Sequence, residues 1–482
     1  MSRPWSFPVA LDPAAREPLA AQIARAVAGD VRRGRLKAGD LLPGTRTLAL
    51  TLGVHRNTVL AAYRELAAEG WITADHRTTR VAEALPAGRP APGPGPARPR
   101  QDPGFTFAPM DIPLRPEPRP AGALFLGGGF PDVRLVPAEL LARAVRRALR
   151  GKGAPLGYGD PQGDLRFRQA LAALLAETRG LAVGAEDLVV TSGSLMGLDL
   201  AARVLLKPGD AVAVEDPGYP QAWHTLRAAG AELVPVPVDA QGLDVDALEA
   251  LLARRPLRAL YMTPHHQFPT TATLTAPRRL RLLDLARRHR FAILEDDHDF
   301  EFHYEGRPVL PLASADPAGV VVYLGSLSKV LAPGLRLGYL AAPPAFTAAL
   351  AARRAITDYH GNQVFERAVA ELLEDGLLQR HVRKVRRINL ERRDVLVEAL
   401  QKSFPGRLHV DVPGGGMSLW VRVEGLPKAR WTRRCREEGV VFPWGSAFDF
   451  HGRERPFIRL GFTALDPREL REAVRRMAAA AD

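Results

Sequence analysis

The sequence predicts an α/β protein in two parts: a small N-terminal module and a larger body around a mostly parallel sheet. Three observations predict this organisation. From about residue 121, apolar strand-like segments alternate with helical segments, as they do when helices are layered on a parallel sheet. Residues 1–85 instead show three helical patterns followed by a short, weakly alternating segment. Residues 86–120 are dense in proline and show neither a helical nor a strand-like periodicity, so we expect an extended linker there.

The composition narrows the class of protein. With 482 residues and 46% hydrophobic residues, the chain can bury large cores in two or three domains. No apolar run approaches the roughly 18 residues that span a bilayer, and the N-terminus lacks the long apolar segment of a secretory signal. Its single cysteine, Cys435, excludes an internal disulfide framework and a multi-cysteine metal site. We therefore expect a cytoplasmic protein that does not enter a membrane.

The charges raise one question about partners and one about chemistry. The net charge is +13, which is compatible with a polyanionic partner such as nucleic acid. Only seven of the 66 cationic side chains are lysine. Arginine keeps its proton, whereas a lysine with a lowered pKa becomes a nucleophilic amine. Lys329, in the serine- and glycine-rich stretch "GSLSKVLAPGLRLGY", is therefore a candidate for chemistry.

The N-terminal module reads as three helices and a hairpin. A first helix is predicted in "PLAAQIARAVAGDVRRGRL", where apolar residues recur at helical spacing. A second begins near Thr45, a candidate N-cap, and a third runs through "HRNTVLAAYRELAAEG" and stops at Gly70. The segment "WITADHRTTRVAE" alternates as a small hairpin or wing would.

Two short helices joined by a tight turn, the second opening with "HRNT", suit a helix-turn-helix. In that motif the first residues of the second helix reach base edges, and exposed donors hold phosphates. On composition alone, a small helical packing domain is the alternative.

The blocks "GRLKAGDLLPGTRTLA", "VHRNTVLAAY" and "EGWI" occur in an order that resembles the winged helix-turn-helix of the GntR family. This resemblance implies that the module binds a double-stranded DNA operator and that five residues face the DNA: Arg46, His55, Arg56, Asn57 and Thr58. The wing departs from the family, because "ADHRTT" has no glycine at its tip. Phosphate contacts from Arg77 and Arg80 are still expected from this wing.

The body carries its polar residues where predicted strands end. In parallel sheets, ligands lie beyond the carboxyl ends of the strands. After "VVT", residues Ser192, Gly193 and Ser194 would present backbone N–H groups at a helix start, which suits a phosphate. Ser326 and Ser328 add hydroxyl groups after "VVYLG".

The remaining strand ends add a guanidinium, a carboxylate, an aromatic ring and an amine. These are supplied by Arg336, by Asp296 after the buried strand "FAILE", by Tyr219 and by Lys329. Taken together, such groups match the needs of pyridoxal 5′-phosphate (PLP). Taken singly, they read as a surface lysine, a salt-bridged strand end and a core aromatic, so their coincidence carries the interpretation.

Residues 121–482 resemble the fold type I aminotransferases. The motifs "YGDPQGDLRFRQALA", "TSGS", "EDPGYP", "TPHHQFPT", "EDD", "SLSK" and "FIRLGF" recur in the order of that family. The resemblance implies a PLP-dependent transferase fold type I body with a smaller C-terminal α+β subdomain. It makes Lys329 the lysine that forms an aldimine with PLP, Asp296 the partner of the pyridine nitrogen and Tyr219 the stacking ring. The implied phosphate site comprises Ser192, Gly193, Ser194, Ser326, Ser328 and Arg336.

Two more residues take roles from the same resemblance. Arg459 of "FIRLGF" would bind the carboxylate of an amino compound, and Tyr158 would lie at a dimer interface.

A GntR-type module fused to such a body resembles the MocR/GabR family of PLP-dependent regulators. This implies a transcriptional regulator that forms a head-to-tail homodimer and responds to PLP or to a small amino compound. The chain departs from the family twice in the body. His298 stands where a tyrosine often contacts the 3-oxygen of the cofactor, and Thr271 stands where glycine is common.

Two alternatives remain. The stretch "EDDHDFEFH" brings carboxylates close to His298 and His303, but the strand context and Lys329 explain it without a metal, so no metal site is expected. Because Lys329, Asp296 and Arg459 are all present, the body is alternatively a catalytically active aminotransferase that carries a DNA-binding domain. We favour the regulator, because a catalyst gains little from a complete winged helix and linker.

Overall fold

The computed structural model describes residues 11–15, 17–75, 78–84, 105–106, 122–150, 153, 155–306 and 308–481. The chain divides into two compact units, Met1–Met110 and Asp111–Asp482, and each is described here by itself. The predicted linker 86–120 lies outside the described residues except for Phe105 and Thr106. The predicted boundaries 1–85, 86–120 and 121–482 stay a prediction.

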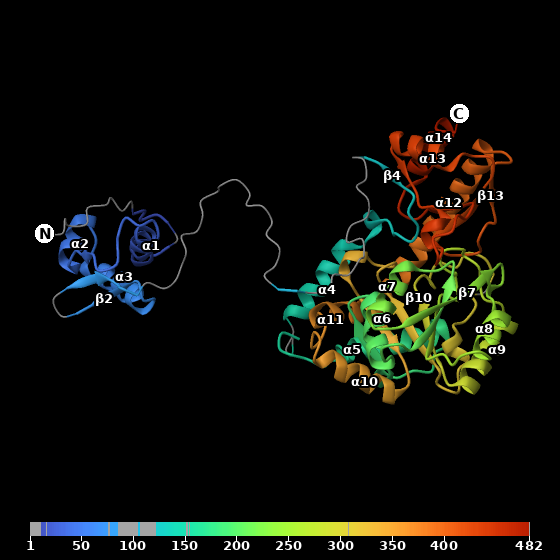
Figure 1. Cartoon of the computed structure of the whole chain (residues 1–482), viewed down its shortest axis with the longest axis horizontal. Helices are drawn as coiled ribbons and strands as arrows, with labels where there is room; N and C mark the ends of the chain where they lie inside the picture. The colour runs from blue at the N-terminus through green and yellow to red at the C-terminus, as the bar shows by residue number, and fades with distance from the viewer. Residues whose placement is uncertain are drawn as a thin grey trace. The chain divides into compact units, whose positions relative to one another are not determined.

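The N-terminal unit is a winged helix-turn-helix, as predicted (Figure 1). Its helices are α1 (Leu19–Arg32), α2 (Thr45–Leu52) and α3 (Arg56–Ala68). Strands β1 (Leu41–Leu42), β2 (Ile72–Ala74) and β3 (Thr79–Val81) form an antiparallel sheet in the order β1-β3-β2. The three helices bury their apolar faces against one another, with Ile23, Leu48 and Val59 at most 2% exposed.

The turn between α2 and α3 depends on a glycine. Gly53 caps the C-terminus of α2 with φ +64°, a left-handed conformation that favours glycine. Thr45 is the first helical residue rather than the N-cap, which is Gly44 and offers no side-chain hydrogen bond. α3 stops at Gly70, as predicted: Glu69 is the C-cap, and Gly70 follows it in the left-handed conformation, with φ +77°.

The body contains an eight-stranded sheet in the order β5-β12-β11-β10-β9-β6-β7-β8. Its strands are β5 (Leu188–Thr191), β6 (Ala211–Asp216), β7 (Glu232–Asp239), β8 (Gly242–Leu243), β9 (Ala259–Met262), β10 (Ala292–Asp297), β11 (Val321–Ser326) and β12 (Gly338–Ala341). β12 runs antiparallel to both neighbours and β8 is antiparallel to β7, while β6, β7, β9, β10 and β11 pair in parallel. The sheet is therefore mostly parallel, as predicted.

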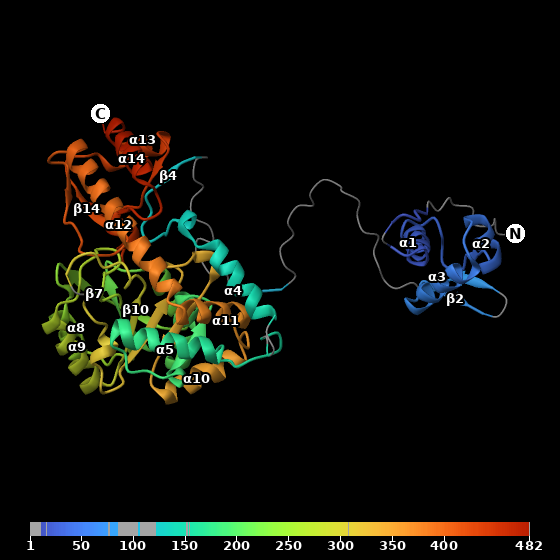
Figure 2. The same ribbon diagram turned by 180° about the vertical axis from the view of Figure 1, so that it is seen from behind.

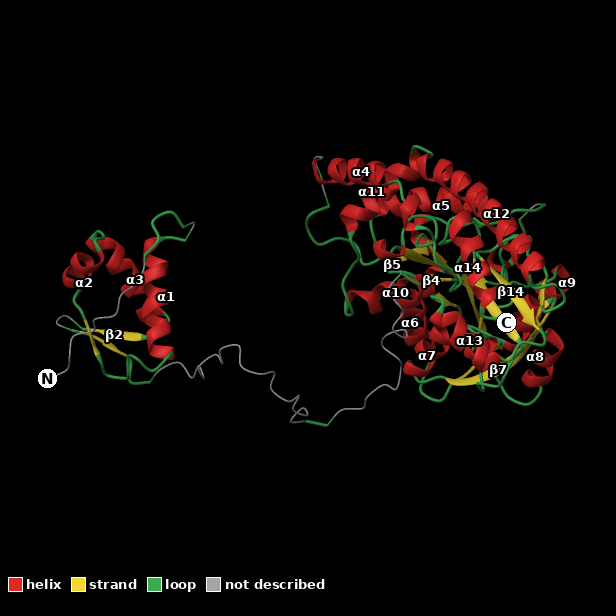
Figure 3. Ribbon diagram, turned by 90° about the horizontal axis from the view of Figure 1, so that it is seen from above, coloured by secondary structure: helices red, strands yellow, loops and turns green. Residues whose placement is uncertain are grey.

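Helices cover both faces of this sheet. One apolar cluster joins the sheet to α4 (Ala138–Arg150), α5 (Leu165–Arg179) and α11 (Gln363–Glu374), and another joins it to α8 (Val245–Leu252) and α9 (Ala276–His289). The opposite face packs on α6 (Ser194–Leu205), α7 (Pro220–Ala228) and α10 (Pro344–Ala355). Figure 3 shows α4, α5 and α11 on one side and α6, α7 and α10 on the other. Near-continuous burial along β5, β6, β9 and β11 follows from this double cover.

A smaller C-terminal subdomain completes the body (Figure 2). The long helix α12 (Leu377–Ser403) leads into an antiparallel sheet of β13 (Leu408–Val410), β14 (Ser418–Val423) and β16 (Phe457–Gly461), flanked by α13 (Lys428–Glu437) and α14 (Pro467–Ala479). β4 (Leu124–Phe125) pairs in parallel with β15 (Val440–Val441). This pairing brings residues 127–130 next to β16. Short 3₁₀ helices occupy Val133–Leu135, Ala185–Asp187, Leu312–Ala315, Pro333–Leu335 and Gly445–Phe448.

No helix in the described ranges is long and apolar enough to cross a membrane.

Candidate functional site

The five residues predicted to face DNA lie at the starts of α2 and α3. Arg46 is exposed in the first turn of α2, and His55, Arg56 and Asn57 are exposed at the start of α3. Arg56 Nε donates a hydrogen bond to Thr45 Oγ1 at 3.4 Å, which joins the two helix starts. Thr58 is half-buried. The arrangement leaves two guanidinium groups and an amide on one exposed edge, which suits phosphate and base contacts.

His55 has a structural role that the sequence analysis missed. Its Nδ1 accepts a hydrogen bond from Asn57 N at 3.2 Å, so it caps the N-terminus of α3. A histidine in an N-cap position is an uncommon cap, and the pattern "HRNT" alone did not suggest it.

Of the two wing residues predicted to contact phosphate, Arg80 is among the described residues. Arg80 is exposed and donates to the carbonyl oxygen of Gly39 at 3.1 Å. Arg77 lies outside the described residues.

The body has a pocket of about 350 Å³ where β6, β9, β10 and β11 end. Six of the predicted site residues line it: Ser194, Tyr219, Asp296, His298, Lys329 and Arg459. The other lining residues are Phe125, Gly127, Gly128, Gly129, Phe130, Gln221, Tyr261, Thr263, Phe268, Pro443 and Phe448. The strands and the C-terminal subdomain together form this pocket, because Arg459 and Pro443 come from the subdomain.

Lys329 presents a buried amine to this pocket. Its Nζ donates a hydrogen bond to the carbonyl oxygen of Gly129 at 2.5 Å. Burial, helped by the charge of Arg459, lowers the pKa of the lysine to about 8. At pH 7 roughly a tenth of such amines are neutral, several hundred times more than at the usual lysine pKa. The amine is therefore prepared for attack on an electrophile.

Asp296 also lines the pocket, and one of its carboxylate oxygens has no hydrogen-bond partner. Its Oδ2 accepts a hydrogen bond from the Tyr261 hydroxyl at 2.7 Å, whereas Oδ1 is buried and has no partner. Burial raises the pKa of this carboxyl, while the hydrogen bond from Tyr261 and the charge of Lys329 oppose the rise. A buried acceptor without a partner costs free energy, so Oδ1 is the natural partner of a ring N–H.

Arg459 is a buried cation without an anion. It is 4% exposed, its Nε has no hydrogen-bond partner, and it forms no ion pair with any residue that the structure describes. Its Cζ lies 4.2 Å from the ring centroid of Phe268. Burial lowers the pKa of the guanidinium to about 10. A buried unpaired charge calls for a negative ligand group, and a carboxylate matches the guanidinium bidentately.

Glycines make room for that cation. A Cβ at Gly128 would lie 2.0 Å from Arg459 Nη1, so a larger residue there would displace the guanidinium. The run "GGGF" at 127–130 was a sequence signal for a close backbone approach, and the sequence analysis did not use it.

The residues predicted to bind the phosphate lie together, but of these six only Ser194 lines the pocket. Arg336 Nη2 donates to the carbonyl oxygen of Ser192 at 2.8 Å, and a Cβ at Gly193 would lie 2.6 Å from the same nitrogen. Gly193, with φ +90°, is the N-cap of α6 and provides no side-chain cap. The first N–H groups of α6 are thereby left for an anion next to the exposed Arg336.

Ser326, the last residue of β11, and Ser328 are buried beside these residues. Ser326 Oγ accepts from Ser328 N at 3.1 Å, and Ser328 Oγ has no partner. Neither residue lines the pocket, and neither do Ser192, Gly193 or Arg336.

Aromatic side chains frame the pocket. Tyr219 meets Phe268 edge to face, with 4.9 Å between the ring centroids. Burial raises the pKa of Tyr219 to about 12 and lowers the pKa of His298, so both side chains are neutral near pH 7. Sequence reasoning missed Tyr261, Phe130, Phe268 and Phe448, because their aromatic side chains read as ordinary core residues.

Thr271 adopts a glycine-like backbone. Its φ is +66°, in the left-handed region that a β-branched residue rarely adopts. Its N–H donates to the carbonyl oxygen of Gln267 at 2.7 Å. The departure from glycine noted in the sequence is therefore a point of backbone strain beside the pocket.

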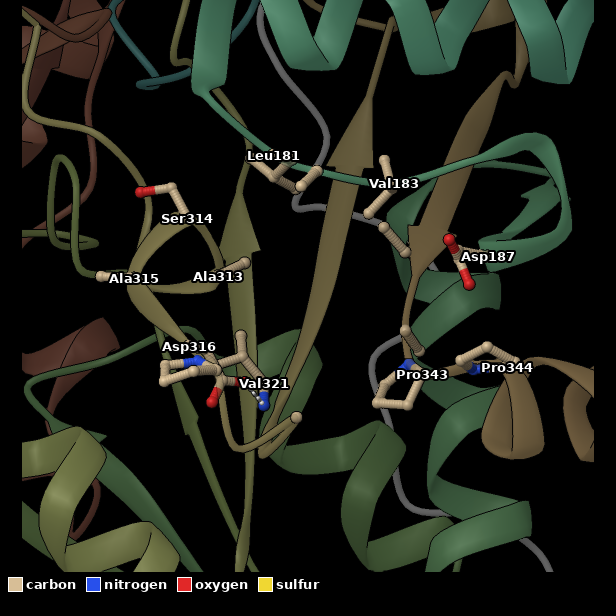
Figure 4. Close-up of a pocket in the computed structure, with 15 residues that line it drawn as sticks. Leu181, Val183, Asp187, Ala313, Ser314, Ala315, Asp316, Val321, Pro343 and Pro344 are labelled. Carbon is tan, nitrogen blue, oxygen red and sulfur yellow. Dashed lines mark hydrogen bonds between the residues drawn. The ribbon is translucent and has the colours of Figure 1, made fainter.

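A larger hollow, of about 630 Å³, lies elsewhere in the body and lacks such chemistry (Figure 4). Its polar side chains are already engaged. Asp316 accepts from Val321 N at 2.7 Å, Asp187 accepts from Gly184 N at 2.8 Å, and Ser314 donates to the carbonyl oxygen of Pro311 at 2.7 Å. With no basic side chain in its lining, it offers nothing for a phosphate or a carboxylate.

Comparison with known proteins supports the predicted family of each part of the chain. Residues 19–80 match the gntR family of bacterial regulatory proteins, and residues 130–477 match aminotransferase class I and II. The probable rhizopine catabolism regulatory protein MocR of Rhizobium meliloti is 31% identical over 479 residues, which is 98% of this chain and 95% of that protein. The HTH-type transcriptional regulator TauR of Rhodobacter capsulatus is 34% identical over 490 residues, 98% of each chain.

The chain belongs to the MocR/GabR-type family of transcriptional regulators. Its N-terminal unit is a DNA-binding domain of the GntR family. The body of this MocR/GabR-type regulator is similar to a solved structure of LysN, an α-aminoadipate aminotransferase from Thermus thermophilus complexed with N-(5'-phosphopyridoxyl)-L-leucine. The two are 33% identical with a TM-score of 0.69, over 75% of this chain and 92% of that one. Fold type I and the helix-turn-helix are thus confirmed, whereas the individual site residues stay predictions.

Proposed function

We propose that this regulator binds PLP through Lys329 and uses its body to sense PLP, or PLP together with an amino compound, in order to change operator binding. One observation carries the proposal. The pocket combines a buried amine of lowered pKa with two buried polar atoms that have no partner, Asp296 Oδ1 and Arg459 Nε. Such groups cost free energy in the free protein, and a ligand that pairs with them recovers it.

Residues in the pocket and beside it fit PLP part by part. The N-terminus of α6 and Arg336 suit its phosphate, Asp296 Oδ1 its ring nitrogen, and Tyr219 one ring face. His298, near the position of the 3-oxygen, offers an imidazole that burial keeps neutral. When bound, PLP supplies an aldehyde that reacts with primary amines. Lys329 provides one such amine, and an incoming amino compound provides a competing one.

Arg459 gives the sensor its selectivity. Its guanidinium is a pocket cation that no other described residue neutralises, and it lies beside Lys329. We infer that the effector carries a carboxylate as well as an amine. Gln221 also lines the pocket but brings no second cation, so a second carboxylate on the effector is not favoured.

A second copy of the chain completes the proposed regulator, which acts on operator DNA in the cytoplasm. Tyr158 is 90% exposed and meets Tyr359, itself half-exposed, at 5.3 Å between ring centroids. Exposed aromatic pairs of this kind are favoured at interfaces. We propose that they lie in the contact of a head-to-tail homodimer, through which occupancy of the body is communicated to the paired DNA-binding domains.

An aminotransferase is the second candidate function. Lys329, Asp296 and Arg459 are all directed to one pocket, as an amino acid transamination requires, and the LysN structure belongs to an enzyme of that kind. Steady multiple-turnover transfer of amino groups by the purified chain would favour the enzyme. Slow or single-turnover transfer, together with operator binding that depends on PLP, would favour the regulator.

Borohydride trapping tests the proposal. Reduction of the PLP-loaded protein, followed by peptide mass spectrometry, is expected to place a pyridoxyl group on Lys329. The variant Lys329→Ala is expected to lose the adduct, while Lys402→Ala, which changes an exposed lysine on α12, keeps it. An adduct on another lysine, or none, would remove PLP from the Lys329 pocket. Operator binding with and without PLP, and then with a panel of amino acids, tests the regulatory step separately.

A further inference from the structure

Three histidines from loops after different strands lie close together in the body. His265 and His266 follow β9, and His303 follows β10. Each contributes one ring nitrogen to a group in which all ligand atoms lie within 4.8 Å of one another. His265 and His266 are 4% and 6% exposed, and their rings stand nearly perpendicular, at 81° with centroids 4.6 Å apart. The stretch "EDDHDFEFH" had suggested His298 and His303 as neighbouring candidate ligands, whereas the fold brings His303 together with His265 and His266.

Two of these nitrogens are buried and have no partner. They are His265 Nδ1 and His303 Nε2. An imidazole nitrogen that is buried without a hydrogen bond costs free energy, and a metal ion satisfies it.

The other ring nitrogens are held as they are in metal centres. His266 Nδ1 is 2.7 Å from Asp299 Oδ1, an arrangement in which the carboxylate fixes the ring and leaves Nε2 as the ligand. The backbone of Gly306 hydrogen-bonds His303, and since Nε2 has no partner, that bond is at Nδ1. Two of the three imidazoles thus have their orientation set by a second contact.

The backbone of Gly415 packs closely against the ring of His266, since a Cβ at Gly415 would lie 2.3 Å from Nε2. His303 also lines a cavity of about 310 Å³ together with Phe300, Glu301 and Arg386, which provides access. None of the three histidines lines the PLP pocket.

We propose that His265 Nδ1, His266 Nε2 and His303 Nε2 form a binding site for one divalent transition-metal ion of the Zn²⁺ class. Three imidazole nitrogens with an open fourth position suit Zn²⁺, Co²⁺ and Ni²⁺ better than the oxygen-seeking Mg²⁺ or Ca²⁺. In a tetrahedral zinc site, ligand nitrogens about 2.1 Å from the metal lie about 3.4 Å from one another. The ligand atoms now lie within 4.8 Å of one another, so binding draws the three side chains closer together, and the fourth ligand comes from the cavity.

Metal titration of the full, untagged, PLP-loaded chain tests this site. Co²⁺ is expected to bind once per chain with the visible absorption of a tetrahedral centre, and Zn²⁺ is expected to displace it. The variants His303→Gln and His265→Gln are expected to weaken binding at least about tenfold, because each loses one ligand. His409→Gln, which changes an exposed histidine paired with Glu424, is the matched control and is expected to bind as the unaltered chain does.

Two results would overturn the site. One is the absence of stoichiometric binding by a chain whose circular dichroism is native. The other is binding that survives both histidine variants but disappears in Lys329→Ala, which would assign the metal to the bound cofactor. His303→Gln is the decisive variant if His265→Gln fails to fold, because His303 is only partly buried.

Discussion

The proposed DNA-binding face and the proposed PLP pocket differ in how their functional side chains are held. At the starts of α2 and α3, the side chains predicted to contact DNA are exposed, and the helices that carry them share a small hydrophobic core. The stability of this unit therefore does not depend on its ligand. In the pocket, Asp296 and Arg459 are buried and each has an atom without a hydrogen-bond partner. These atoms are therefore satisfied only when a ligand binds. Exposed donors are solvated by water at little cost, whereas buried ones are not. Ligand binding is therefore expected to change the stability of the body and to leave that of the DNA-binding unit almost unchanged.

The largest expected effect is on thermal unfolding. Saturating PLP, at about 100 times its Kd, is expected to stabilise the body by about 2.7 kcal/mol. Scanning calorimetry should show the transition of the body shift upward while that of the N-terminal unit stays in place, and Lys329→Ala should abolish most of the shift. An equal shift of both transitions would contradict the contrast between the two units.

The next effect concerns pH. Because burial lowers the pKa of Lys329 to about 8, the neutral amine that captures PLP is fully present above that value and declines as the pH falls below it. We expect the rate of PLP capture, followed by absorbance, to fall about tenfold per pH unit below about pH 7 and to level off above about pH 9. A midpoint near the ordinary lysine value of about 10.4 would mean that the amine is solvated rather than buried.

On the DNA side, Arg56→Ala is expected to weaken operator binding about tenfold, since one good base or phosphate contact contributes about 1–3 kcal/mol. Arg64→Ala, which changes another exposed arginine on the same helix, is the control. Fluorescence anisotropy with operator DNA measures both variants. Neither is expected to alter the absorption of bound PLP, and equal affinities would exclude the start of α3 from the DNA contact.

The smallest effect is expected from Thr271→Gly. A left-handed backbone costs a non-glycine residue about 1–2 kcal/mol, and glycine loses about 0.5–1 kcal/mol through its greater freedom when unfolded. The free energy of unfolding of the body should therefore rise by about 0.5–1 kcal/mol, measured by chemical denaturation. A decrease would show that the Thr271 side chain contributes more than its backbone strain removes.

Local sequence patterns predicted much of the fold and several residues of the candidate site. Helical spacing, the tight turn between two short helices and the opening "HRNT" are local features, so they predicted the DNA-binding unit closely. The order of strand-end motifs likewise predicted the fold of the body and named Lys329, Asp296, Tyr219 and Arg459. Each of these signals depends on neighbours along the chain or on a motif that keeps its order.

Only the tertiary structure decided which side chains meet and which are left without partners. The pairing of β4 with β15 brings Gly128 against Arg459, and no local pattern encodes that contact. Likewise, the fold brings together His265, His266 and His303, from loops after different strands, and orients Asp299 toward the group. Burial and the absence of a partner are properties of the packed chain, because they depend on groups that lie far apart in the sequence. The pKa shift of Lys329 follows from them, and it could not be read from the residues around position 329.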